Sequence, residues 1–91
     1  MMNIEFLVHD VRVEHDVALI SGIVNMGEIP IGTVFTRARQ ESSAVQEIHL
    51  TVSKIIAYRR EIDSLPVGMS GELHLVGAEA AILTKHTMLE A

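Results

Sequence analysis

The segment from Val17 to Phe35 limits most strongly what this 91-residue chain can fold into. It reads VALISGIVNMGEIPIGTVF, so three glycines and a proline interrupt short runs of Val, Ile and Leu. β-Branched residues favour strands, and a glycine inside such a run marks a bend or a place where another backbone comes close. The pattern predicts a β-rich fold in which Gly22 has that role and Gly27 and Gly32 can adopt positive φ.

Further apolar runs predict strands along the rest of the chain. We expect them over residues 4–14, 17–25, 33–37, 46–59 and 71–76, with a short last strand near Ile82. Within 4–14, Phe6 and Val8 differ in parity from Val11 and Val13. Because strand side chains alternate, placing all four in one core requires a β-bulge or bend near residues 9–10.

The candidate strand 46–59 alternates between an apolar and a polar face, as expected of an antiparallel strand with one solvated side. Its inward positions are Ile48, Leu50, Val52 and Ile56, and in the strand 71–76 they are Leu73 and Leu75. Pro30 lacks an N–H and belongs at an edge or in a loop. Five or six short strands without a convincing long helix predict an all-β fold, a small closed or nearly closed antiparallel β-barrel of about six strands. We expect residues 1–91 to form a single domain.

Composition narrows the classes of partner. The chain has 12 acidic and 7 basic residues and a formal net charge of −5, which disfavours nucleic acid as a partner. It has no cysteine, so it contains neither a disulfide nor a thiolate metal site, and this suits the cytoplasm. No secretion signal and no apolar run long enough to span a membrane is present, so we expect no membrane association.

Three segments together resemble a known family. Residues 22–35 read GIVNMGEIPIGTVF and look like the Gly-x-Val-x-x-Gly-x-Ile-x-x-Gly segment in the second domain of elongation factor Tu-type translation GTPases. Residues 6–13, FLVHDVRV, are similar to the first strand of that domain. Residues 67–77, VGMSGELHLVG, resemble the strand that ends in its Leu-x-Leu-x-Gly motif. The resemblance covers about residues 4–77 and implies the β-barrel fold of that domain.

In those GTPases the barrel lies beside a nucleotide-binding domain and helps to form surfaces for transfer RNA, ribosomal RNA or protein partners. Here we expect it to stand alone. Glu28 and Ile29 occupy the place where a phosphate-binding loop would carry Lys and Ser or Thr, so nucleotide binding there is not expected. The matching residues are glycines and core apolar residues, and the resemblance therefore assigns no ligand contact.

No catalytic, cofactor or metal site is predicted. Of the five histidines, His49 and His74 are the best metal candidates because both lie on polar faces of candidate strands that could be neighbours; exposed strand histidines are the simpler interpretation. The carboxylate pairs Glu14/Asp16 and Glu61/Asp63 fall in predicted turns, where solvated charges are common. Residues 42–43 are serines without an adjacent base, which does not support a hydrolase.

A basic cluster gives the best candidate for partner binding. It holds five of the seven cations, namely Arg37, Arg39, Lys54, Arg59 and Arg60. If they converge, an acidic domain acquires one positive patch for an acidic partner or an RNA backbone; ordinary surface charge is the alternative. The polar segment 39–44 is the expected mobile loop.

From these features we expect a non-enzymatic, stand-alone protein-interaction module without cofactor, which binds a protein partner or a second copy of itself. Its predicted working edge comprises the 37–45 loop and the Arg59–Arg60 region. The alternative, which the family resemblance favours, is an RNA-binding factor associated with translation or the ribosome. The net acidity counts against this alternative, and so does the small number of aromatic residues, three in all, because single-strand binders use stacking platforms and positive grooves.

Overall fold

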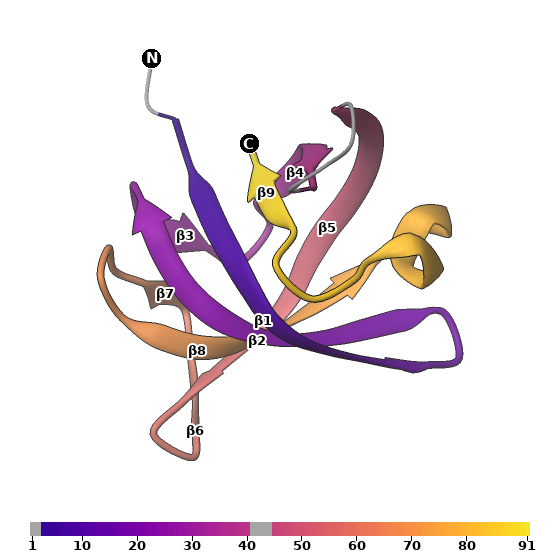
Figure 1. Cartoon of the computed structure of the whole chain (residues 1–91). Coiled ribbons are helices and arrows are strands. Elements are labelled where there is room, and N and C mark those ends of the chain that lie inside the picture. Colours follow the sequence, from indigo (N-terminus) through magenta and orange to yellow (C-terminus); the bar gives the residue numbers. More distant parts are fainter. Residues whose placement is uncertain (1–2, 41–44) are drawn as a thin grey trace.

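The computed structural model describes residues 3–40 and 45–91 (Figure 1). Within these ranges the elements follow one another along the chain as nine strands and one 3₁₀ helix. They are β1 (Glu5–Glu14), β2 (Val17–Met26), β3 (Ile29–Pro30), β4 (Val34–Arg39), β5 (Gln46–Ala57), β6 (Arg60–Ile62), β7 (Ser64–Leu65), β8 (Ser70–Val76), η1 (Ala78–Ile82) and β9 (Met88–Glu90).

The main sheet closes on itself. In the described residues its strands run in the order β4-β9-β1-β2-β8-β5, β5 pairs back with β4, and β6 extends the sheet from β5. Every pairing is antiparallel. We call the ring of β4, β9, β1, β2, β8 and β5 the closed sheet. It confirms the predicted all-β, closed antiparallel architecture. Closure pairs strand edges that would otherwise be exposed.

The closed sheet surrounds an apolar core. Phe6, Ile20, Leu50 and Leu73 are among its fully buried side chains. The two-residue strands β3 and β7 pair with each other and bury Ile29 and Leu65, and elsewhere Ala80 of η1 is buried as well. In Figure 1 the β3–β7 pair and η1 lie on opposite sides of the closed sheet. These short elements cover parts of the core that the main strands leave open.

The glycine predictions are confirmed. A Cβ on Gly22 would overlap the carbonyl oxygen of Leu7, so the backbones of β1 and β2 meet there as only glycine permits. Gly27 and Gly32 have φ of 77° and 93°. Pro30 lies in the short β3 and not in a central strand.

The predicted irregularity of β1 is also observed, but it does not bring Val13 into the core. The β1–β2 register shifts between Val8 and Asp10, and Val11 packs against the core. Val13 was predicted to be a core residue, but it is 42% exposed. The reason is that β9 pairs with β1 only at residues 5–7, so no strand in the described structure covers the outer edge of β1 at Val13.

Two other sequence predictions are wrong. Ile48, Leu50 and Val52 are buried as expected, but Ile55 is buried instead of Ile56, because the β5–β8 register shifts between Val52 and Lys54 and reverses the parity. Near Ile82, where a last strand was expected, the chain forms the 3₁₀ helix η1, and the last strand is β9.

Two other expected strands are present with slightly different bounds. The segment 33–37 forms β4 over Val34–Arg39, and 46–59 forms β5 over Gln46–Ala57. Residues 41–44 of the expected mobile loop lie outside the described residues.

Candidate interaction surface

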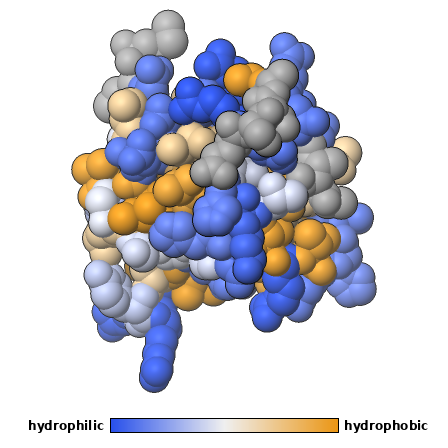
Figure 2. Space-filling model, in the orientation of Figure 1, coloured by the Kyte–Doolittle hydropathy of each residue, from blue (hydrophilic) through white to orange (hydrophobic). Residues whose placement is uncertain are grey.

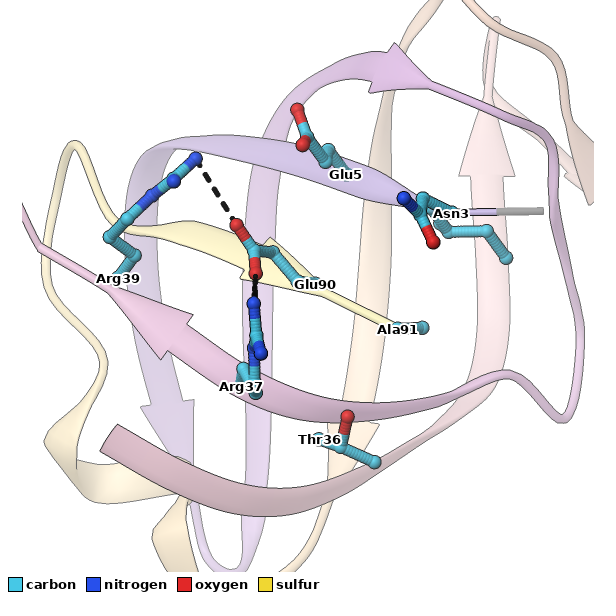
Figure 3. Close-up of a pocket in the computed structure, with 8 residues that line it drawn as sticks. Asn3, Glu5, Thr36, Arg37, Arg39, Glu90 and Ala91 are labelled. Atoms are coloured by element: carbon cyan, nitrogen blue, oxygen red, sulfur yellow. Dashed lines mark hydrogen bonds and ion pairs between the residues drawn. The ribbon is translucent and has the colours of Figure 1, made fainter. Parts of the chain in front are cut away.

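The two arginines of β4 share one carboxylate. Nε and Nη2 of Arg37 lie 3.2 and 2.9 Å from Oε1 of Glu90, and Nη2 of Arg39 lies 3.1 Å from Oε2 of the same side chain (Figure 3). Glu90 is in β9, the strand that joins β4 to β1. Its side chain is 13% exposed, so both oxygens are committed to the two guanidiniums. These arginines therefore hold the closed sheet together at the β4–β9 pairing.

Figure 3 shows the hollow that these residues line, about 420 Å³ in volume. Glu5 lies on the same hollow, and its Oε1 accepts a hydrogen bond of 2.8 Å from Nδ2 of Asn25. Two arginines and two glutamates thus balance each other's charge. We do not assign a ligand to this hollow.

The other three members of the basic cluster lie near the opposite end of β5. Glu47 of β5 pairs with Arg37, whereas Ala57 pairs with Arg60. The ten residue-to-residue steps from Glu47 to Ala57 correspond to about 33 Å along a strand at about 3.3 Å per residue. The five cations therefore form two separate groups and not one patch.

Lys54 belongs to the second group but is engaged in an ion pair. Its Nζ lies 3.2 Å from Oε1 of Glu61 in the neighbouring β6. Arg12 pairs with Glu14 at 3.7 Å, and Lys85 with Asp10 at 3.9 Å. Of the seven cations, Arg59 and Arg60 are the two that have no carboxylate partner in the part of the chain that the structure describes.

Arg59 follows Tyr58 in the two-residue turn that joins β5 to β6, and both have left-handed backbones. Their φ values are 63° and 55°. Positive φ at both central positions is the signature of a type I′ hairpin turn, which strongly prefers Asn-Gly. Each non-glycine residue in this conformation costs about 1–2 kcal/mol. Tyr58 is nevertheless 79% exposed, so no burial of its ring offsets this strain.

The hairpin tip, which we define as residues 58–60, projects from the closed sheet. In Figure 1 the β5–β6 hairpin extends beyond the other strands, and Figure 2 shows hydrophilic side chains projecting at that end of the molecule. An open groove of about 440 Å³ begins beside it. The groove is lined by Tyr58 and Arg59 of the tip, Ile56 of β5, Ser70 of β8, Ser21 of β2 and His9 of β1.

The structure does not bring His49 and His74 together. Nε2 of His74 lies 3.1 Å from Oε2 of Glu72, and its cross-strand neighbour on β5 is Lys54. The backbone N–H of His49 donates to Oε1 of Glu79 in η1 at 3.0 Å. No cluster of three or more His, Asp or Glu side chains suited to a metal ion occurs among the described residues.

The sequence indicated Arg59 and Arg60 as candidate residues but did not point to Tyr58 or to the groove. A lone tyrosine at a strand end before two arginines is a signal, but its turn conformation is not visible in the sequence because neither turn residue is Gly, Asn or Asp. The groove combines residues from four strands, and only their pairing shows that they are neighbours.

Comparison with known proteins identifies the class of fold as that of a translation-factor β-domain. Among similar solved structures is the apo form of the translation elongation factor SelB from Methanococcus maripaludis, with a TM-score of 0.81 and 11% sequence identity. The match covers 98% of this chain and 19% of that one, so the chain spans about a fifth of SelB. No family model and no curated protein matches the sequence. The predicted resemblance to a translation-factor domain is thus confirmed at the level of fold.

The described residues include no helix that is long and apolar enough to cross a membrane.

Proposed function

We propose that this chain is a non-enzymatic binding module that docks an acidic protein surface through the hairpin tip. The observation that carries the proposal is the tip itself, where Arg59 and Arg60 stand beside an exposed Tyr58 on a strained turn. Backbone strain of this kind persists where the surrounding structure enforces it, and it concentrates at functional positions. The strain supports a role for these side chains beyond holding the fold.

The chemistry of the tip fits protein recognition. Tyrosine and arginine are the residues, together with tryptophan, that most often dominate the binding energy of protein interfaces. A guanidinium without an intramolecular carboxylate can pair with a partner's Asp or Glu without first breaking an ion pair. The net charge of −5 repels an acidic partner from the rest of the surface, so the local positive charge of the tip orients such a partner toward it.

RNA is the second candidate partner, and two observations favour it. The fold is that of a β-domain in a translation factor, and the tip pairs an aromatic ring with two guanidiniums, the groups that stack on bases and contact phosphates. The net charge opposes it, since a chain with 12 acidic residues repels a polyphosphate. We therefore place the protein partner first. The translation-factor-like fold supports placing the chain in the cytoplasm, where translation occurs.

The test compares two charge-reversal variants in affinity capture from a cell lysate. Arg59→Glu with Arg60→Glu should abolish capture of the partner. Arg12→Glu with Lys85→Glu changes the net charge by the same amount at exposed positions away from the tip and should leave capture intact. Retention of every partner by the first variant would refute the proposal.

Nuclease treatment and a salt series separate the two candidates. A captured protein should survive treatment of the lysate with ribonuclease. If the tip instead binds RNA, capture disappears on that treatment, and filter binding of purified RNA weakens steeply as salt rises, because phosphate contacts release counterions.

A further inference from the structure

The groove beside the hairpin tip crosses four neighbouring strands, from Ile56 of β5 through β8 and β2 to His9 of β1. Arg59 and the ring of Tyr58 lie at one end, and half-buried Ile56 provides an aliphatic surface next to them. Ser21 and Ser70 are small, which keeps the groove open. Its volume of about 440 Å³ is in the range of sites that hold small or short extended ligands.

An acidic residue of the groove determines where a negatively charged ligand group can lie. Glu72 also lines it, on β8, and its Oε2 lies 3.1 Å from Nε2 of His74. A ligand carboxylate near Glu72 would be repelled, whereas at the Arg59 end it finds a guanidinium with no ion-pair partner among the described residues. Glu72 lies directly across from Ile56 in the β5–β8 pairing, in the middle of the groove, so a ligand carboxylate is favoured at Arg59 and disfavoured beyond Ile56.

We propose that the groove binds an extended peptide segment in which an acidic residue adjoins an aliphatic one. The acidic side chain pairs with Arg59, and the aliphatic side chain packs on Ile56 beside the Tyr58 ring. Ser21 and Ser70 offer hydroxyls to the peptide backbone. This inference rests on the proposed function and deepens it, because it specifies which part of an acidic partner docks and where.

Charge complementarity selects this occupant. A basic peptide would meet Arg59 and Arg60 at the tip with like charge, which is unfavourable in a partly desolvated groove. A purely aliphatic peptide would leave the guanidinium of Arg59 covered and unpaired. A segment with an acidic and an aliphatic side chain avoids both penalties.

The experiment is selection of a random 12-residue peptide library on the immobilised full chain. Enriched peptides should contain Asp or Glu next to Leu, Ile or Val. The best peptide is then synthesised and titrated into the protein in solution. Tyr58 is the sole tyrosine and the chain has no tryptophan, so its fluorescence reports directly on the groove wall.

Four variants define the expected result. Ser70→Leu fills the groove at an exposed position, Ile56→Thr removes its aliphatic surface, and Arg59→Gln removes its cation. Each substitution should lower the affinity for the peptide about tenfold or more, equivalent to about 1.4 kcal/mol of binding free energy. Arg12→Gln, the control for loss of one charge, should change affinity less than about twofold. Enrichment of basic or acid-free peptides, no enrichment at all, or unchanged affinity in Ser70→Leu and Ile56→Thr overturns the inference.

The same variants separate this inference from the proposed function. If Ser70→Leu and Ile56→Thr still capture the lysate partner while Arg59→Glu with Arg60→Glu does not, docking at the tip holds and the groove inference is wrong. If the double reversal still captures the partner, the proposed function fails and the groove inference fails with it. A second copy bound in the groove would appear as a dimer in size-exclusion chromatography that Ser70→Leu dissociates, and this would also overturn the peptide inference.

Discussion

Gly22 of β2 packs directly against Leu7 of β1, and a Cβ at Gly22 would overlap the Leu7 carbonyl oxygen and lie 2.9 Å from Cε2 of Phe6. Phe6 is fully buried, so neither neighbour can move away without disturbing the core. Gly22→Ala should therefore lower the free energy of unfolding by about 3 kcal/mol, at the upper end of the cost of overpacking. Urea unfolding followed by circular dichroism measures it.

Gly32→Ala is the matched control for that substitution. Gly32 has φ of 93°, but no atom lies within 4 Å of the position its Cβ would occupy. Only backbone strain is added, and the expected loss is about 1 kcal/mol. Equal losses in the two variants would show that the close approach of β1 and β2 does not limit stability.

Replacing the strained hairpin tip should stabilise the protein and impair binding. Tyr58→Asn with Arg59→Gly supplies the residues that a type I′ turn prefers. We expect the free energy of unfolding to rise by about 1 kcal/mol, because the left-handed penalty at Arg59 is removed and that at Tyr58 is reduced. Thermal unfolding and partner capture are measured on the same preparation. A less stable variant, or a stabilised variant that binds normally, would contradict the role assigned to the strain.

Glu90→Gln should loosen the β4–β9 pairing. The substitution removes the charge that holds Arg37 and Arg39, and we expect a loss of about 1 kcal/mol because both arginines are more than half exposed and solvent screens them. Glu61→Gln, which breaks the exposed pair with Lys54, serves as the comparison and should change stability by less than about 0.5 kcal/mol. Raising the salt concentration should narrow the difference between the two variants. A larger loss for Glu61→Gln would reverse the assigned importance of these ion pairs.

Mild acid should promote self-association. Protonation of all five histidines changes the formal net charge from −5 to 0 while the carboxylates stay ionised. Charge repulsion between molecules then disappears, and light scattering should increase between pH 7 and about pH 5.5. Constant scattering over this interval would contradict the prediction, and added salt at pH 7 provides the control for simple screening.

Local patterns predicted much of the fold. The glycines of residues 17–35 indicated turns and a close approach, and the parity change between Val8 and Val11 indicated the irregularity of β1. These features depend on residues close together in the sequence. The bulge in β5 left no such trace, because the apolar pair Ile55 and Ile56 is compatible with either parity and pairing with β8 decides between them.

The candidate site was less predictable than the fold. Arg37 and Arg59 both belong to the basic cluster, yet Arg37 is neutralised by Glu90, which lies 53 positions away in the sequence. Arg59, in the turn of the β5–β6 hairpin, has no carboxylate partner in the described residues. Charge counts and spacing contain no information about such pairings.

The sequence by itself determined the all-β class, the antiparallel strands and the conformational roles of the glycines, because side-chain alternation and backbone freedom are local properties of the chain. Tertiary structure alone decided that β9 closes the sheet, that the five cations separate into two groups, and that Tyr58 and Arg59 border a groove built from four strands. The physical reason is that strand register and ion pairing depend on contacts between segments distant in sequence, which form only when the sheet closes.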